Sequence, residues 1–191
     1  MKQKQSTREK SLGTVSPTDV SVESLPVVEL DKHQIRRAAA LSYDRNHSYE
    51  RIDGGDVYSS DSRMSHLIGI ICEMAVGEAY SSNIDTQAYR SGDDGIDLDL
   101  WDQSIDVKGT ATTAMDRPDL LVQPHKTLGA DLYILAHIIG WGAESVRVRL
   151  HGYADQETVT DREPRRYPGS DENYVVEPDE LTLLPWITTG E

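Results

Sequence analysis

Hydrophobic and polar positions follow two different periods along this chain, and the period changes near its middle. In the N-terminal half, apolar residues recur at helical spacing, which predicts helices over residues 30–51 and 62–80. Asp31 stands where the N-cap of the first helix is expected. The middle of the second helix, LIGIICEMAV over residues 67–76, is apolar almost all round, so we expect this helix to be buried.

From residue 95 onward apolar and polar residues alternate, which is typical of β-strands. The runs over 95–101 and 104–108 are joined by Asp102-Gln103 and predict a β-hairpin. Downstream, the pattern predicts strands over 131–139, 145–153 and 174–176, with short helical segments over 155–161 and 178–184. Two helices followed by a run of strands predict an α/β or α+β domain, with a mixed central β-sheet flanked by helices.

Length and composition limit the domain organisation and the class of protein. A chain of 191 residues suits one domain, which we place at residues 28–191 behind a disordered tail over residues 1–27. The N-terminal segment has no apolar core of a secretory signal, and no apolar run approaches the roughly 20 residues of a membrane helix. One cysteine excludes a disulfide framework. We therefore expect a soluble, cytoplasmic protein with no membrane partner.

The charge balance is strongly acidic. The chain carries 33 Asp and Glu against 19 Lys and Arg, a formal net charge of −14. Lysine is scarce, with three of six lysines in the first ten residues, and phenylalanine is absent. This composition fits a halophilic protein, whose net charge maintains solubility in a high-salt cytoplasm. An ordinary acidic protein is the alternative. Acidity normally argues against a nucleic-acid partner, but screening in molar salt weakens that argument.

The hairpin gathers carboxylates. With Asp102-Gln103 as the loop, Asp99 pairs with Asp106 and Asp97 pairs with Lys108, with partners about 5 Å apart on one face. Like charges placed opposite each other destabilise a hairpin unless a cation lies between them. A hard divalent ion with oxygen ligands meets that need. The alternative is a structural acidic protein in which the six aspartates of residues 93–106 form a solvated face.

Two further charged residues stand out from their surroundings. Lys108 is one of only three lysines beyond residue 10, and it lies in a strand next to apolar positions. Glu73 is the only charged residue in the apolar helix segment over 67–76. A carboxylate in such a place needs a metal or an ionic partner. For Glu73 the alternative to a metal is an ion pair with an arginine such as Arg63 or Arg90.

These residues together resemble the PD-(D/E)XK nuclease superfamily, which has the restriction-endonuclease-like fold. The matching segments are Gly69 to Glu73 in the helix, Gly95-Ile96-Asp97, and Asp106-Val107-Lys108. The resemblance covers about residues 60–186, and the downstream pattern is similar to the small nucleases of phage and archaeal genomes, here of haloarchaeal type. The proline that names the motif is absent, and Gly95 precedes Ile96-Asp97 instead.

The resemblance implies a role for each of these residues. Glu73, Asp97 and Asp106 would hold Mg²⁺ or Mn²⁺, with the carbonyl of Val107 as an extra ligand, and Lys108 would position or activate the attacking water. The implied function is a metal-dependent nuclease that hydrolyses phosphodiester bonds in DNA, and a homodimer is expected if both strands are cut. The alternative is a non-catalytic DNA-binding or assembly domain that retains the fold.

Candidate nucleic-acid contacts lie near this motif. Thr110 continues the strand of Lys108, and Gln123 and Lys126 follow the hairpin, so these three are the predicted DNA-binding residues, although Thr110 also suits an ordinary strand position. The arginine cluster over residues 162–166 fits either a phosphate-backbone contact or a solvated loop. The histidines show no metal-binding spacing, and we expect His137 to be a core residue.

Overall fold

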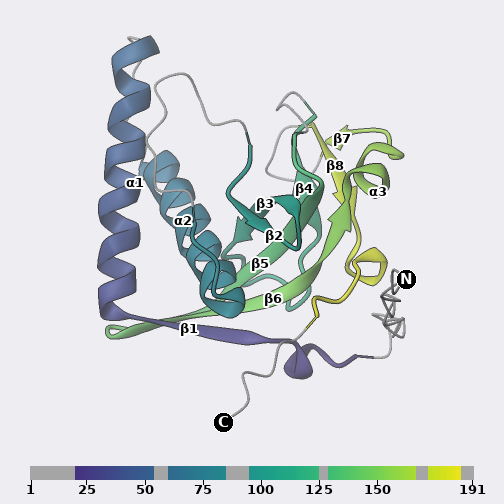
Figure 1. Ribbon diagram of the computed structural model, residues 1–191, viewed down its shortest axis with the longest axis horizontal. Coiled ribbons are helices and arrows are strands. Elements are labelled where there is room, and N and C mark those ends of the chain that lie inside the picture. The colour runs from purple at the N-terminus through teal and green to yellow at the C-terminus, as the bar shows by residue number, and fades with distance from the viewer. Residues whose placement is uncertain (1–19, 54–59, 85–94, 125–128, 167–171, 186–191) are drawn as a thin grey trace, which may run out of the picture.

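The strands of this chain form a curled, mixed β-sheet flanked by helices, in a computed structural model that describes residues 20–53, 60–84, 95–124, 129–166 and 172–185 (Figure 1). The helical elements are η2 (Val22–Ser24), α1 (Lys32–Asp53), α2 (Ser60–Tyr80), α3 (Gln156–Thr160) and η3 (Pro178–Glu180). The strands are β1 (Val27–Asp31), β2 (Leu98–Leu100), β3 (Gln103–Thr110), β4 (Leu120–Val122), β5 (Leu132–Trp141), β6 (Ser145–Asp155), β7 (Arg165–Arg166) and β8 (Glu172–Val176).

The main sheet has the strand order β1-β6-β5-β3-β2. Its neighbours are antiparallel except for β3 and β5, which run parallel, so the sheet is mixed as predicted. A second group of strands has the order β4-β8-β7. The first seven residues of β5 are buried without alternation, because this central strand is covered on both faces.

Two hydrophobic clusters lie on the two faces of the main sheet. In Figure 1, α1 and α2 lie side by side against one face, where α2 packs on β3. The buried middle of α2, including Ile70 and Ile71, joins Ile105, Ile134 and Val148 of the sheet in the larger cluster. The smaller cluster covers the other face and contains residues of β4, β8 and α3. The predicted burial of the second helix is therefore confirmed.

The N-terminal end of the domain differs from the prediction. Of the predicted tail over residues 1–27, residues 1–19 lie outside the described chain, whereas η2 and the start of β1 fall within it. The predicted helix start at Leu30 was wrong, because Val28 and Leu30 alternate with exposed residues and pair in β1 with β6. A five-residue strand next to a helix leaves too short an alternating signal to separate the two elements.

The N-cap prediction for α1 is confirmed. Asp31 Oδ1 accepts a hydrogen bond from Gln34 N at 2.9 Å, and Gln34 Oε1 accepts one from Asp31 N at 2.8 Å. This reciprocal capping box satisfies backbone donors at the helix start and fixes the turn from β1 into α1. None of the described helices combines the length and apolar character that a bilayer crossing requires.

Candidate active site

The hairpin is present, but its register differs from the predicted one. Leu98 pairs with Ile105, Asp99 with Ser104, and Leu100 with Gln103. The two loop residues are therefore Trp101 and Asp102, whose φ angles of 56° and 61° fit the type I′ turn that suits a two-residue hairpin. Residues other than Gly, Asn and Asp rarely adopt positive φ, so a turn at Trp101 could not be predicted from its residue type.

The new register brings Asp97, not Asp99, beside Asp106. Asp97 N donates to Ile105 O at 2.8 Å, and Asp97 Oδ2 accepts from Val107 N at 2.7 Å. Asp97 is thus bonded to β3 on either side of Asp106. Both aspartates are buried, with exposed fractions of 7% and 9%, whereas Asp99 is exposed. The predicted pairs Asp99–Asp106 and Asp97–Lys108 were wrong.

Lys108 contacts the carboxylate of Asp106 directly. The two residues are two positions apart on β3, and Lys108 Nζ lies 2.5 Å from Asp106 Oδ2. Their side chains are 22% and 12% exposed, so the ion pair is partly shielded from water. A charge-assisted contact in such surroundings is stronger than one on an open surface. The pair fixes an ammonium group beside two buried carboxylates.

Glu73 is paired with an arginine, as the alternative to a metal ligand required, and this arginine is Arg45. Arg90 lies outside the described residues. Glu73 is buried on α2, and Arg45 Nη1 of α1 lies 3.1 Å from its Oε2 and 3.2 Å from its Oε1. Both side chains are largely buried, at 7% exposed for Glu73 and 14% for Arg45. This ion pair joins the two helices, and it places a compensating charge beside the carboxylate in the apolar helix segment.

The site depends on close packing between α2 and β3. Gly109 follows Lys108, and a Cβ atom at this position would lie 3.0 Å from Cys72 Sγ and 3.2 Å from Ile68 O. Cys72 is fully buried, and its Sγ donates to Ala136 O at 3.5 Å. Burial raises the pKa of the Cys72 thiol, and the charge of Glu73 raises it further. The cysteine is therefore a packing residue, as expected from the sequence.

Tyr133 of β5 pairs with Asp106 of β3 and was not predicted from the sequence as a neighbour of the site. Its hydroxyl is buried and has no hydrogen-bond partner among the described residues. Burial raises the pKa of Tyr133 to about 12, with a further contribution from the negative charge of Asp106. The parallel pairing of β3 with β5 is not visible in a local pattern, so no sequence signal linked Tyr133 to the motif.

The predicted metal ligands are only partly brought together. Within the described ranges, no three His, Cys, Asp or Glu side chains lie close enough to hold a metal ion. Asp97 and Asp106 lie next to each other on the hairpin, while Glu73 is paired with Arg45. Mg²⁺ often takes only one or two protein carboxylates and completes its shell with water and substrate phosphates. The two buried aspartates have the donor chemistry of such a partial site.

The predicted DNA-binding residues fall at different places. Thr110 ends β3 and is partly buried beside His137 of β5. Gln123 follows β4 and, like Thr110, is partly buried. Lys126 lies outside the described residues. Of the three, Thr110 alone is on the strand that carries Asp106 and Lys108.

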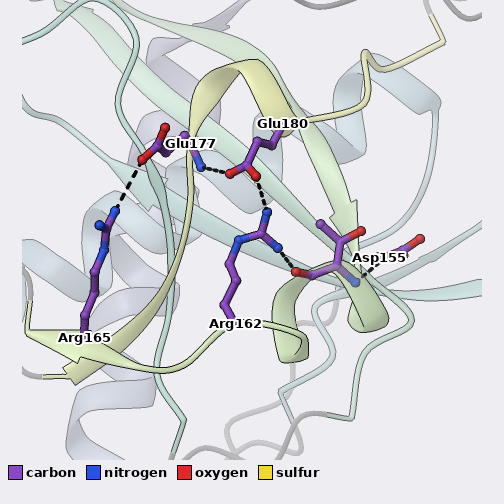
Figure 2. Close-up of polar contacts among 6 residues, drawn as sticks. Asp155, Arg162, Arg165, Glu177 and Glu180 are labelled. Carbon is purple, nitrogen blue, oxygen red and sulfur yellow. Dashed lines mark hydrogen bonds and ion pairs between the residues drawn. The ribbon is translucent and has the colours of Figure 1, made fainter.

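The arginine cluster over residues 162–166 is drawn into a network with acidic residues. Arg162 Nη2 lies 2.7 Å from Glu180 Oε1 (Figure 2). Arg162 Nη1 donates to the carbonyl of Thr158. Arg165 Nη2 lies 3.6 Å from Glu177 Oε1. The backbone N–H of Glu177 lowers the pKa of Glu180, and Arg162 lowers it further. Arg162 and Arg165 therefore have carboxylate partners within the chain.

Comparisons with protein-family models, with curated proteins and with solved structures found no match to this chain. The geometry of the site is the basis for any functional conclusion.

Proposed function

We propose that this protein is a divalent-metal-dependent DNA nuclease with a restriction-endonuclease-like core. The observation that carries the proposal is the contact between Lys108 and Asp106, with Asp97 bonded to β3 on either side of Asp106. Two buried carboxylates side by side are costly to remove from water, and positive charges beside them, including the Lys108 ammonium, lower that cost. The arrangement supports the binding of a divalent ion.

Asp97 and Asp106 would hold Mg²⁺ or Mn²⁺ in this proposal, with the carbonyl of Val107 as a third oxygen. The N–H of Val107 donates to Asp97, and the N–H and C=O of one strand residue point to the same side. The carbonyl is therefore directed toward the Asp97 edge of β3. When bound, the cation would polarise a phosphoryl oxygen and lower the pKa of a water molecule.

Lys108 supplies the remaining chemistry from this chain. Asp106 holds its ammonium in place, and the side chain is still 22% exposed, so it can reach an incoming phosphodiester. It would donate hydrogen bonds to the attacking water or to the phosphoryl oxygens on which charge develops. Glu73 would act indirectly, because its ion pair with Arg45 holds α1 against α2 behind β3.

The second candidate function is a non-catalytic DNA-binding or assembly domain. It is favoured by the ion pair of Glu73 with Arg45, and by the lack of a three-carboxylate group in the described part of the chain. A binding domain of this kind would keep the fold and bind DNA without turnover. The two candidates differ in whether Lys108 and Asp106 are needed for hydrolysis.

A plasmid-nicking assay in high KCl with Mg²⁺ or Mn²⁺ distinguishes these functions. The wild type is compared with Lys108→Ala and Asp106→Asn, and with the matched control Asp99→Asn, an exposed carboxylate on the same hairpin. If the protein is a nuclease, the wild type and the control should cut the plasmid. Each site variant should cut it at least about 100-fold more slowly. DNA binding without cleavage by folded wild type would support the non-catalytic domain instead.

A further inference from the structure

A second cluster of polar side chains lies away from the carboxylate hairpin. His137 of β5 and His151 of β6 are buried, with exposed fractions of 3% and 4%, and their ring centroids are 5.5 Å apart. Arg149 of β6 pairs directly with His137 across the two strands. His137 in turn pairs with Thr110, which lies four residues beyond Asp106, or about 13 Å along β3. The cluster is thus separate from the candidate active site.

Each of these three side chains has a buried nitrogen without a hydrogen-bond partner among the described residues. The atoms are His137 Nδ1, His151 Nε2 and Arg149 Nε. Leaving a buried polar group unsatisfied costs about 1–3 kcal/mol, and more for a charged group, so nearly all such groups in proteins are bonded. Three on adjacent strands indicate a ligand that supplies the missing partners.

The strand β6 is shaped so that the two histidines meet. Leu135 pairs with Gly152 but Ala136 pairs with Leu150, so His151 is an extra, unpaired residue in a β-bulge. Such bulges redirect a side chain and are common near functional sites. Gly152 has a φ of 148°, and a Cβ atom there would lie 2.6 Å from Thr182 O, so the bulge requires glycine.

The charge of the cluster favours an anion over a cation. His137 Nε2 lies 2.7 Å from the carbonyl oxygen of Thr112, which can only accept, so Nε2 carries a proton. Burial, together with the nearby His137, Arg149 and Arg117, lowers the pKa of His151 to about 3. The positive charges of Arg149 and Arg117 would repel a metal ion. An oxyanion would accept the Arg149 Nε–H and would stabilise protonated rings that donate through the two unpaired nitrogens.

We propose that His137, His151 and Arg149 form a binding site for an oxyanion of the phosphate class, distinct from the site of Asp97, Asp106 and Lys108. A tetrahedral oxyanion has several acceptor oxygens, enough for three donors carried by two adjacent strands. Free phosphate and the phosphodiester group of a nucleic acid share this chemistry. The site stands on its own contacts and does not depend on the nuclease activity.

Isothermal titration calorimetry with inorganic phosphate, in EDTA and at fixed KCl, tests the site. Wild type is expected to bind phosphate, and Arg149→Leu to weaken binding at least about tenfold, the effect of removing one charge-assisted hydrogen bond. The matched control is Arg147→Leu, an exposed arginine two residues away on β6, which should bind as the wild type does. Circular dichroism checks that each variant is folded.

Nuclear magnetic resonance of the histidine rings tests the same site in the wild-type protein, without a substitution. Phosphate should shift the ring signals of His137 and His151 and leave the exposed His33 unchanged. A thymidine dinucleotide with one internal phosphodiester replaces phosphate in a second arm. Shifts with both probes identify a nucleic-acid backbone contact, and shifts with phosphate alone identify a free-anion site. No binding of either probe to folded wild type, or unchanged binding by Arg149→Leu, would overturn the proposal.

Discussion

The ammonium of Lys108 lies 2.5 Å from a carboxylate oxygen of Asp106, while Asp97 is bonded to the strand on either side of that same aspartate. One positive charge therefore lies beside two buried negative charges. A lysine in this position opposes the binding of a cation and at the same time assists chemistry at a phosphate. The two effects can be separated by experiment.

Replacing Lys108 with methionine should strengthen divalent-metal binding while it abolishes cleavage. Loss of the ammonium removes repulsion of the cation, so we expect Mn²⁺ affinity to rise roughly tenfold or more. Cleavage should fall by about 100-fold to 10,000-fold, because the group that assists the water is gone. Asp106→Asn should instead lose both properties. Titration calorimetry with Mn²⁺ measures the affinity, and weaker Mn²⁺ binding by Lys108→Met would contradict this assignment.

The buried ion pair between Arg45 and Glu73 should show strong energetic coupling. Removing one partner takes a compensating charge away from a buried group, so Arg45→Met or Glu73→Gln alone should cost about 3–5 kcal/mol of unfolding free energy. The double variant should cost clearly less than the two single losses combined. Urea denaturation provides the three free energies.

The exposed pair Lys32–Glu144 is the matched control for this cycle. Its side chains are 44% and 71% exposed, although the charged atoms are only 2.6 Å apart. Removing either partner should change the unfolding free energy by no more than about 1 kcal/mol. If removing a partner of the buried pair changes the unfolding free energy as little as this, the ion pair with Arg45 does not stabilise the folded protein.

The protein should lose stability as the pH falls below about 6.5, through His151. The folded chain holds the pKa of His151 at about 3, against an ordinary value of 6.5, so the unfolded chain binds the proton first on acidification. The stability is complete above pH 6.5 and decreases toward pH 3, by up to about 1.4 kcal/mol per pH unit.

Urea titrations at pH 7 and pH 5 measure this dependence. His151→Phe should flatten the slope over that range, and His33→Gln, at an exposed position on α1, should leave it unchanged. The carboxyl groups of Asp131, Asp155 and Glu180, whose pKa values are lowered by hydrogen bonds, add their own loss of stability only at more acidic pH. An unchanged slope in His151→Phe would rule out the histidine as its cause.

Adding a methyl group at Gly109 should displace α2 from β3. A Cβ atom would lie 3.0 Å from Cys72 Sγ and 3.1 Å from Cys72 Cβ, so the buried Cys72 side chain on α2 would have to move by a few tenths of an ångström. We expect Gly109→Ala to cost about 1–3 kcal/mol of unfolding free energy. Gly140→Ala on β5, where the nearest atom is 3.8 Å away, should cost less. Equal costs in thermal unfolding would show that helix and strand are not tightly packed here.

Periodicity was sufficient to predict the long elements of this fold. The apolar segment over residues 67–76 gave the buried helix. A continuous apolar run gave β5, and alternation gave β3 and β6, each within a few residues. Pairing between distant strands was not accessible, because local patterns carry no information on which strand lies beside β5. For that reason Tyr133 was not linked to Asp106, and β4 and β7 were missed.

The candidate site shows the same limit. The residues Asp97, Asp106 and Lys108 were predicted correctly as neighbours on one hairpin. The turn, Trp101-Asp102 with positive φ, begins one residue earlier than predicted, so the residue opposite Asp106 changes by two positions, from Asp99 to Asp97. For Glu73 a metal or an arginine such as Arg63 or Arg90 was expected, and the arginine paired with it is Arg45 of the preceding helix. Whether these residues bind a metal and cut DNA stays a prediction.

The pairing of β1 with β6 has a consequence for synthesis of the chain. Val27 lies opposite Arg149, which comes roughly 120 residues later in the sequence. At a ribosomal rate of roughly 5–20 residues per second, β6 is therefore synthesised about 6–24 s after β1. During that time a bare strand invites pairing with other nascent chains, and the acidic side chains of Glu29 and Asp31 at its exposed positions oppose such contacts by charge repulsion.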